Sequence, residues 1–403
     1  MNTEARAQTI NLGAGPSMLP TEVLQEAAQG IIDYGDTGIG LLELSHRSST
    51  FKDMLMQAEN DLRTLLDIPN DYAVLFLQGG GTEQFSATLL NMLAAHAAKH
   101  KGQGAAPPVD YVISGAWSSK AYKEARRLYE PVRQVVDMRK NIGDASKPIP
   151  SPQTWDLSNV EENPAMLYYC DNETIDGFEM PQDFIQQLPE KYRQQVPIVA
   201  DCSSNILSRP FDIRSHAVVF FGAQKNVGPS GVTIVVVRRD LVVDPDMFPM
   251  PTIPRIPCTM VYKNAMDNGS LYNTPPSFPI YVSGLGFKKL LRDGGVHRAQ
   301  ELANARAQLV YDVIEKHPTI FKPTVAHPEF RSKMNLTFRV LDAATGEPSE
   351  AEEARFVKLF ADHRVVQVKG HRSVGGIRIS LYNASTYEMA QKIESLMLQF
   401  AKA

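Results

Sequence analysis

Short apolar runs alternate with amphipathic segments along the first two thirds of the chain. The runs are rich in β-branched and aromatic residues, which is typical of buried strands, and they cover 72–77, 111–113, 132–136, 166–170, 198–200, 217–221 and 232–237. Between them, apolar residues recur every three or four positions, which predicts helices that include 21–31, 51–66 and 118–129. This alternation predicts an α/β fold with a mostly parallel sheet that helices cover on both faces.

The pattern changes from about residue 285. Helical periodicity covers 285–292, 299–315, 351–361 and 386–402, whereas 334–340 and 376–381 alternate like strands. Two strands among helices predict a smaller α+β domain. We therefore expect an N-terminal arm over residues 1–20, a large domain over 21–284 and a small C-terminal domain over 285–403.

Composition narrows the function classes. The chain has 403 residues and a formal net charge of −4, so it carries no electrostatic signature of a nucleic-acid-binding protein. Its 3 cysteines are an odd number, which favours buried thiols in a reducing compartment over a disulfide framework or a zinc site. No apolar run approaches the length of a membrane span, and residues 1–8 lack the apolar core of a signal peptide. We expect a cytoplasmic protein with no membrane contact.

The most unusual feature is a single lysine, Lys225, in a turn rich in Gly, Pro and Ser between the strands 217–221 and 232–237. Burying a lysine is costly unless its amine is neutral or has reacted. A desolvated amine suits Schiff-base chemistry, most often with pyridoxal phosphate. The alternative at this point is a turn that projects Lys225 into solvent.

A possible phosphate site follows the strand 72–77. Glycines 79–81 and Thr82 lie between this strand and a helix, where free backbone N–H groups, the helix dipole and a hydroxyl favour an anion. The spacing matches neither a Walker loop nor a dinucleotide fingerprint. The alternative is an ordinary tight turn.

Other candidate groups follow further strands. Asp201 could keep a pyridine nitrogen protonated, Trp117 could stack on its ring, and Thr174 could bond its hydroxyl. Each has a structural alternative as a turn or core residue. Because the carboxyl ends of parallel strands meet at one edge of a sheet, we expect these groups to converge with Lys225.

The chain resembles the class-V aminotransferases, pyridoxal-phosphate enzymes of fold type I, and within them the phosphoserine aminotransferases. The resemblance covers nearly the whole chain through Gly15-Pro16, Ser45-His46-Arg47, Gly79 to Gly81, Asn172 to Gly177, Asp201 to Ser204, Gly222 to Asn226, Asn273 to Pro276, Lys369 to Arg372 and Gly375 to Arg378.

The resemblance implies a role for each matched residue. Lys225 would form the Schiff base and Asp201 would pair with the pyridinium. The resemblance also implies the remaining contacts with the cofactor. Its phosphate would be held by Gly81, Thr82 and Gln224, and by Asn273 and Thr274 from a partner subunit. Its ring would stack on Trp117, and its ring hydroxyl would bond to Thr174. The resemblance therefore also implies a homodimer with active sites at the interface.

The implied reaction moves an amino group from glutamate to 3-phosphohydroxypyruvate, giving 2-oxoglutarate and O-phosphoserine in L-serine biosynthesis. Two substrate anions need cationic anchors, for which arginine has the best fork geometry. The resemblance assigns Arg378 to the α-carboxylate, and His46, Arg47, His371 and Arg372 to the phosphate. Thr82 departs from family members that have arginine there.

Three alternatives remain from the residues themselves. The chain could have another class-V activity, as a glyoxylate transaminase or a cysteine desulfurase, although Cys170 and Cys202 are associated with strands and Cys258 lies in a proline-rich run. It could bind a metal through His96 and His100, but no third ligand is evident, so we expect no metal and an exposed helix face. It could also be a non-catalytic homologue.

Overall fold

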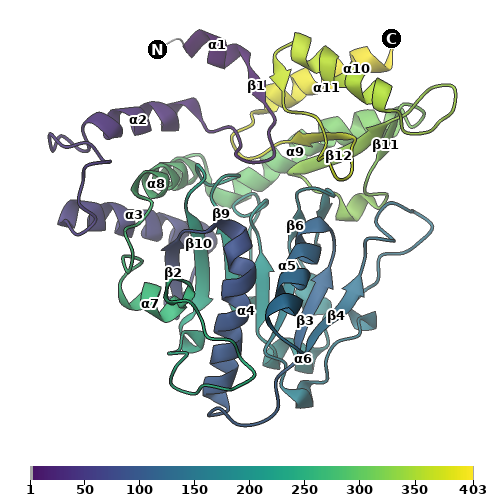
Figure 1. The fold of residues 1–403 in the computed structure, drawn as a ribbon. Coiled ribbons are helices and arrows are strands. Elements are labelled where there is room, and N and C mark those ends of the chain that lie inside the picture. The colour runs from purple at the N-terminus through teal and green to yellow at the C-terminus, as the bar shows by residue number, and fades with distance from the viewer. Residues whose placement is uncertain (1–2, 403) are drawn as a thin grey trace.

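A seven-stranded sheet forms the centre of the computed structural model, which describes residues 3–402 (Figure 1). Residues 1 and 2 of the expected N-terminal arm and residue 403 lie outside the described residues. The strand order is β2 (Tyr72–Leu77), β10 (Thr233–Arg238), β9 (Val218–Gly222), β8 (Ile198–Asp201), β5 (Met166–Cys170), β3 (Val109–Ile113) and β4 (Val132–Asp137). Only β10 runs against its neighbours among these strands. The prediction of a mostly parallel sheet is confirmed.

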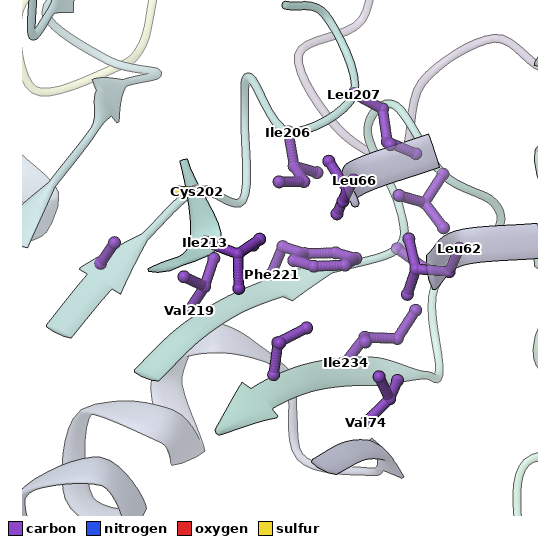
Figure 2. Packing of buried hydrophobic residues seen from close by; sticks show 14 of the residues in the cluster. Leu62, Leu66, Val74, Cys202, Ile206, Leu207, Ile213, Val219, Phe221 and Ile234 are labelled. Carbon is purple, nitrogen blue, oxygen red and sulfur yellow. The ribbon is translucent and has the colours of Figure 1, made fainter. Parts of the chain in front are cut away.

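Helices cover both faces of this sheet. On one face lie α2 (Thr21–Ile32), α3 (Ser49–Leu66) and α8 (Ser277–Arg292), and on the other α4 (Gly80–Lys99), α5 (Ala116–Leu128) and α7 (Tyr262–Asp267). Alternate residues of a strand point to opposite faces, so Val74 and Phe76 of β2 join the first core while Ala73 and Leu75 join the second. Figure 2 shows part of the first core, in which Leu62 and Leu66 of α3 lie over Phe221 of β9.

The C-terminal part of the chain forms a second, smaller sheet. Its order is β11 (Phe321–Pro323), β12 (Asn335–Val340) and β14 (Ile377–Ser380), packed with α9 (Gly295–Lys316), α10 (Glu350–Asp362) and α11 (Tyr387–Ala401). Strand β11 was not predicted, because three residues that include a lysine and a proline show no alternating pattern at the edge of a sheet.

The N-terminal arm is joined to this second sheet region. Strand β1 (Ile10–Asn11) pairs with β13 (Val365–Val366), and the purple arm lies beside the yellow C-terminal helices in Figure 1. Helix α8 runs across residue 284, where the sequence predicted a domain boundary. The division into an arm, a large and a small domain therefore stays a prediction. Among residues 3–402, no helix combines the length and the apolar character that crossing a membrane requires.

Candidate active site

The carboxyl ends of the parallel strands surround a cavity of about 260 Å³. Nine residues predicted from the sequence line it: Gly81, Thr82, Trp117, Thr174, Asp201, Gln224, Lys225, His371 and Arg378. Asp201 and Arg378 come from the two sheets, the residues before Thr174 come from the starts of α4 and α5, and the remaining four come from turns and loops. The expected convergence of these groups with Lys225 is thus present in the geometry of one chain.

Lys225 points into the cavity, so the alternative of a solvent-facing lysine is wrong. Its Nζ donates a hydrogen bond of 2.7 Å to Thr174 Oγ1. Burial lowers the pKa of the Lys225 amine, while the charge of Asp201 opposes this shift and that of Arg378 adds to it. The turn is anchored from the N-terminal arm, because Ser17 Oγ donates to the Lys225 carbonyl oxygen at 2.5 Å. A larger neutral fraction of the amine favours attack on a carbonyl.

Asp201 is the last residue of β8 and is 5% exposed. Burial raises the pKa of its carboxyl group, whereas a hydrogen bond from the Ser203 amide, 2.9 Å from Oδ1, and the charge of Lys225 lower it. An acidic group at this depth can hold the proton of a bound aromatic nitrogen, because it has few competing hydrogen-bond partners.

The start of α4 forms the anion-binding end of the cavity. Gly79, the N-cap residue, has a φ of 88°, a conformation that a side chain would strain, and it turns the chain directly from β2 into the helix. The first N–H groups of a helix lack intrahelical acceptors, so those near Gly81 and Thr82 are suited to a phosphate. Ser203 lies close by, since a Cβ on Gly81 would be 3.5 Å from its Oγ.

The indole of Trp117, in the first turn of α5, forms another wall. Its ring centroid is 5.8 Å from Lys225 Nζ, and its Nε1 is buried without a hydrogen-bond partner. The cavity therefore combines an aromatic wall, a buried carboxylate, a lysine and an anion-binding helix start. These groups fit a planar pyridine ring with a carbonyl substituent and a phosphate tail, which is the structure of pyridoxal phosphate.

Arg378 and His371 from the C-terminal part of the chain also line the cavity. Arg378 of β14 donates from Nη1 to the Thr174 carbonyl oxygen at 3.2 Å, which leaves other guanidinium donors free for a carboxylate. The pKa of His371 is lowered by burial and by the charges of Arg378, Lys120 and Arg372. The guanidinium group of Arg378 thus faces the cavity in a chain of negative net charge.

Five predicted residues do not line this cavity: His46, Arg47, Asn273, Thr274 and Arg372. Asn273 and Thr274 line a separate cavity of about 160 Å³. His46 and Arg47 precede α3 in the segment that connects it to α2. The predicted roles of these five residues stay predictions, and those of Asn273 and Thr274 involve a partner subunit.

The cavity also contains residues to which the sequence analysis gave no role, including Asn172, Ser203 and Ser204. Ser204 Oγ donates to the Asn172 carbonyl oxygen at 2.7 Å, which ties the turn after β8 to the segment after β5. Their position in the sequence could have identified them as site residues, because each lies within three residues of a predicted site residue at the same sheet edge.

The prediction of an exposed face for His96 and His100 is wrong. Their rings stack with centroids 4.3 Å apart and line a cavity of about 570 Å³ at the other end of α4. Both are half-buried because the segments around residues 163 and 196 pack against this end of the helix. Within residues 3–402, no group of three or more His, Cys, Asp or Glu side chains could hold a metal ion.

The cysteines do not favour desulfurase chemistry. Cys170 and Cys202 are buried, and burial raises the pKa of both thiols, which suppresses the reactive thiolate. Cys258 is exposed but is absent from the cavity that contains Lys225.

Comparison with known proteins agrees with this geometry. The family model described as Aminotransferase class-V matches residues 9–393. Phosphoserine aminotransferase of Drosophila melanogaster is 41% identical over 393 residues, covering 98% of each chain, and that of Idiomarina loihiensis is 37% identical, covering 98% of this chain and 99% of the other.

Solved structures give the same result. Phosphoserine aminotransferase from Bacillus circulans subsp. alkalophilus superposes with a TM-score of 0.84 at 36% identity, covering 98% of both chains. The phosphoserine aminotransferase of Trichomonas vaginalis, solved with its cofactor PLP bound, has a TM-score of 0.82 at 34% identity and covers 97% of this chain and 99% of its own. With a matched family model over nearly its whole length and a lysine, carboxylate and anion site in one cavity, the chain belongs to the class-V aminotransferases.

Proposed function

We propose that this protein transfers the amino group of glutamate to 3-phosphohydroxypyruvate, giving 2-oxoglutarate and O-phosphoserine in L-serine biosynthesis. The cofactor is pyridoxal phosphate. The observation that carries the proposal is the position of Lys225, whose amine lies in one cavity with Asp201, Trp117 and the start of α4. Full-length relatives named phosphoserine aminotransferase support the choice of substrate.

Each residue of the cavity has a defined task in this proposal. Lys225 would bind the cofactor covalently through Nζ, and Asp201 would keep the pyridine nitrogen protonated. Gly81, Thr82 and Gln224 would hold its phosphate, and Trp117 and Thr174 its ring and ring hydroxyl. When bound, pyridoxal phosphate supplies an electron sink that stabilises negative charge on the substrate Cα.

The protein supplies the proton transfer and the orientation of substrate. With the cofactor bound, the Lys225 amine would take the proton from the substrate Cα as general base and then, as general acid, give it to the cofactor's former carbonyl carbon. Thr174 Oγ1 lies within hydrogen-bond distance of Nζ and orients it. Arg378 would bind the α-carboxylate, while His371 and Arg372 would bind the phosphate or the side-chain carboxylate of glutamate.

We further propose a cytoplasmic homodimer in which each subunit completes its partner's site. His46, Arg47, Asn273 and Thr274 would contribute from the partner side. Apolar side chains near these segments are exposed, including Leu42 at 62%, Ile39 at 45% and Tyr272 at 49%. Exposed apolar side chains around polar residues support an interface at these segments.

A visible absorption spectrum of the purified protein with pyridoxal phosphate tests the proposal. We expect a cofactor band that changes when O-phosphoserine is added and responds much less to L-alanine. Lys225→Ala should lose the band characteristic of covalent attachment. A wild-type protein without that band, or one that responds to alanine and ignores O-phosphoserine, contradicts the proposal.

A further inference from the structure

Helix α5, which carries Trp117, is capped from a distant part of the chain. The first N–H groups of a helix have no acceptor within the helix. Here three of them donate to carboxylates of the turn that follows β5: Trp117 N to Glu173 Oε2 at 2.8 Å, Ser118 N to Glu173 Oε1 at 2.9 Å, and Ala116 N to Asp176 Oδ2 at 2.8 Å. The hydroxyl of Ser118 also donates to Glu173 Oε1, at 2.5 Å.

The residue at the N-cap position makes this approach possible. It is Gly115, and a Cβ there would lie 2.5 Å from Asp176 Oδ2 and 2.6 Å from Glu173 Cδ. Any side chain that could cap the helix locally would collide with the two carboxylates. The sequence thus replaces a local cap by contacts between positions more than 50 residues apart.

This arrangement is a costly way to stabilise a helix. Glu173 is fully buried, and burial followed by the charge of Asp176 raises its pKa to about 7. Neither carboxylate forms an ion pair with any side chain of the described part of the chain, and the nearby Arg139 is paired with Asp137. A Ser at the N-cap would satisfy the helix without burying charge. Helix stability alone therefore gives no reason for the buried pair.

The residue that follows Glu173 in this turn, Thr174, lines the active-site cavity. Thr174 accepts a hydrogen bond from Lys225 Nζ through its side chain and another from Arg378 through its carbonyl oxygen. The turn is closed by a bond of 2.8 Å from the Gly177 amide to the Glu173 carbonyl oxygen. Glu173 therefore contacts the helix that carries the Trp117 indole, and the adjacent residue, Thr174, contacts the catalytic lysine.

We propose that Glu173 is a positioning residue that, with Asp176, holds the start of α5 so that Trp117 faces the cofactor ring at a fixed distance from Thr174 and Lys225. Glu173 does not line the cavity and acts through Trp117. The inference rests on the pyridoxal-phosphate site of the proposed function and adds a residue to which no role was assigned there.

Cofactor titration of Glu173→Gln tests this role. In a Trp155→Phe background Trp117 is the single tryptophan of the chain, so its fluorescence reports on its surroundings. Glutamine replaces one acceptor oxygen by an amide donor and leaves a helix N–H unpaired. We expect the Kd for pyridoxal phosphate to rise about tenfold. In the apoprotein, Trp117 emission should shift to the red and become more accessible to acrylamide.

Glu173 and Glu179 lie on the two short strands of one hairpin, β6 (Asn172–Glu173) and β7 (Phe178–Glu179). Glu179→Gln is the matched control, because Glu179 is also a buried carboxylate but accepts from Asn205 and from the Lys333 amide. It should change thermal stability and leave the Kd and the Trp117 signal at wild-type values. If Glu173→Gln does not fold, Asp176→Ala, which removes the acceptor of the Ala116 N–H and leaves the Glu173 contacts in place, is measured with the same two readouts.

The outcomes separate the two proposals. A wild type that does not bind pyridoxal phosphate contradicts the proposed function. A wild type that binds it, together with a folded variant whose Kd and Trp117 emission equal those of the wild type, overturns the positioning role even when the variant melts at a lower temperature.

Discussion

Lys225 Nζ donates its hydrogen bond to the side chain of Thr174, 51 positions earlier in the chain. Thr174 is 4% exposed, so this bond is largely shielded from water. The same threonine accepts Arg378 Nη1 at its carbonyl oxygen. The amine that reacts with the cofactor and the guanidinium proposed to bind the substrate carboxylate are therefore aligned by one residue.

Thr174→Val should weaken cofactor binding without unfolding the protein. Valine has a similar shape but lacks the hydroxyl, so Lys225 loses its acceptor and the cofactor ring hydroxyl loses its proposed partner. A hydrogen bond of this kind contributes about 1 kcal/mol, so we expect the Kd for pyridoxal phosphate to rise about fivefold to tenfold. Equilibrium absorbance titration measures it. Thr174→Ser retains the hydroxyl and should bind the cofactor nearly as tightly as the wild type.

Arg378→Lys should affect substrate binding more than the chemical step. Lysine keeps the positive charge but cannot donate two parallel hydrogen bonds to a carboxylate. We expect KM to increase about tenfold or more for both amino-acid substrates, with a smaller change in kcat. Steady-state kinetics with O-phosphoserine and glutamate measure both parameters.

The control for this change is Arg339→Lys. Arg339 lies on the neighbouring strand β12, is paired with Glu353 and does not line the active-site cavity. Its KM values should stay at those of the wild type. An Arg378→Lys enzyme with unchanged KM would show that the α-carboxylate binds elsewhere.

Phe221→Ala should destabilise the fold beneath the lysine turn. Phe221 is fully buried in β9 and packs in the core with Leu62 and Leu66 (Figure 2). Removing a buried aromatic ring costs about 3–5 kcal/mol, which a denaturant titration of the apoprotein would detect. Met247→Ala, at a side chain that is 64% exposed, should change the free energy of unfolding by less than about 0.5 kcal/mol.

Local patterns were sufficient to predict the central sheet. All seven strands lie within two residues of their predicted ends, because their apolar runs are strong and the turns between them are rich in glycine and polar residues. The sheet in turn places Asp201 and Lys225 at one edge, so the predicted parallel direction of the strands and the chemistry of these residues were enough to predict the centre of the site.

Features that depend on contacts between distant segments were not predictable in the same way. The half-buried positions of His96 and His100 depend on segments 60 to 100 residues away that close over the end of α4. Glu173 was part of a matched motif, but its contact with α5 depends on a hydrogen-bond geometry that no periodicity encodes. Strand β11 is defined mainly by its pairing with β12.

His216 should make the protein less stable in acid. It is 3% exposed and bonds to Tyr169 Oη and to the Asp212 carbonyl oxygen, both at 2.8 Å, and burial lowers its pKa to about 4. In the unfolded chain the pKa of histidine is about 6.5. The unfolded state therefore binds a proton first as the pH falls.

The stabilising effect of neutral His216 is fully present above pH 6.5 and is lost as the pH falls towards 4. The difference between the two pKa values corresponds to about 3 kcal/mol of unfolding free energy. His216→Asn should lower stability at pH 7 but flatten the decline below pH 6.5, measured by urea unfolding at a series of pH values. His96, whose pKa is also about 4, contributes equally to the pH dependence of the wild type and of His216→Asn.

His297→Gln, at an exposed histidine of α9, is the control and should keep the wild-type slope. Equal slopes for the wild type and His216→Asn would mean that His216 is protonated as readily in the fold as in the unfolded chain.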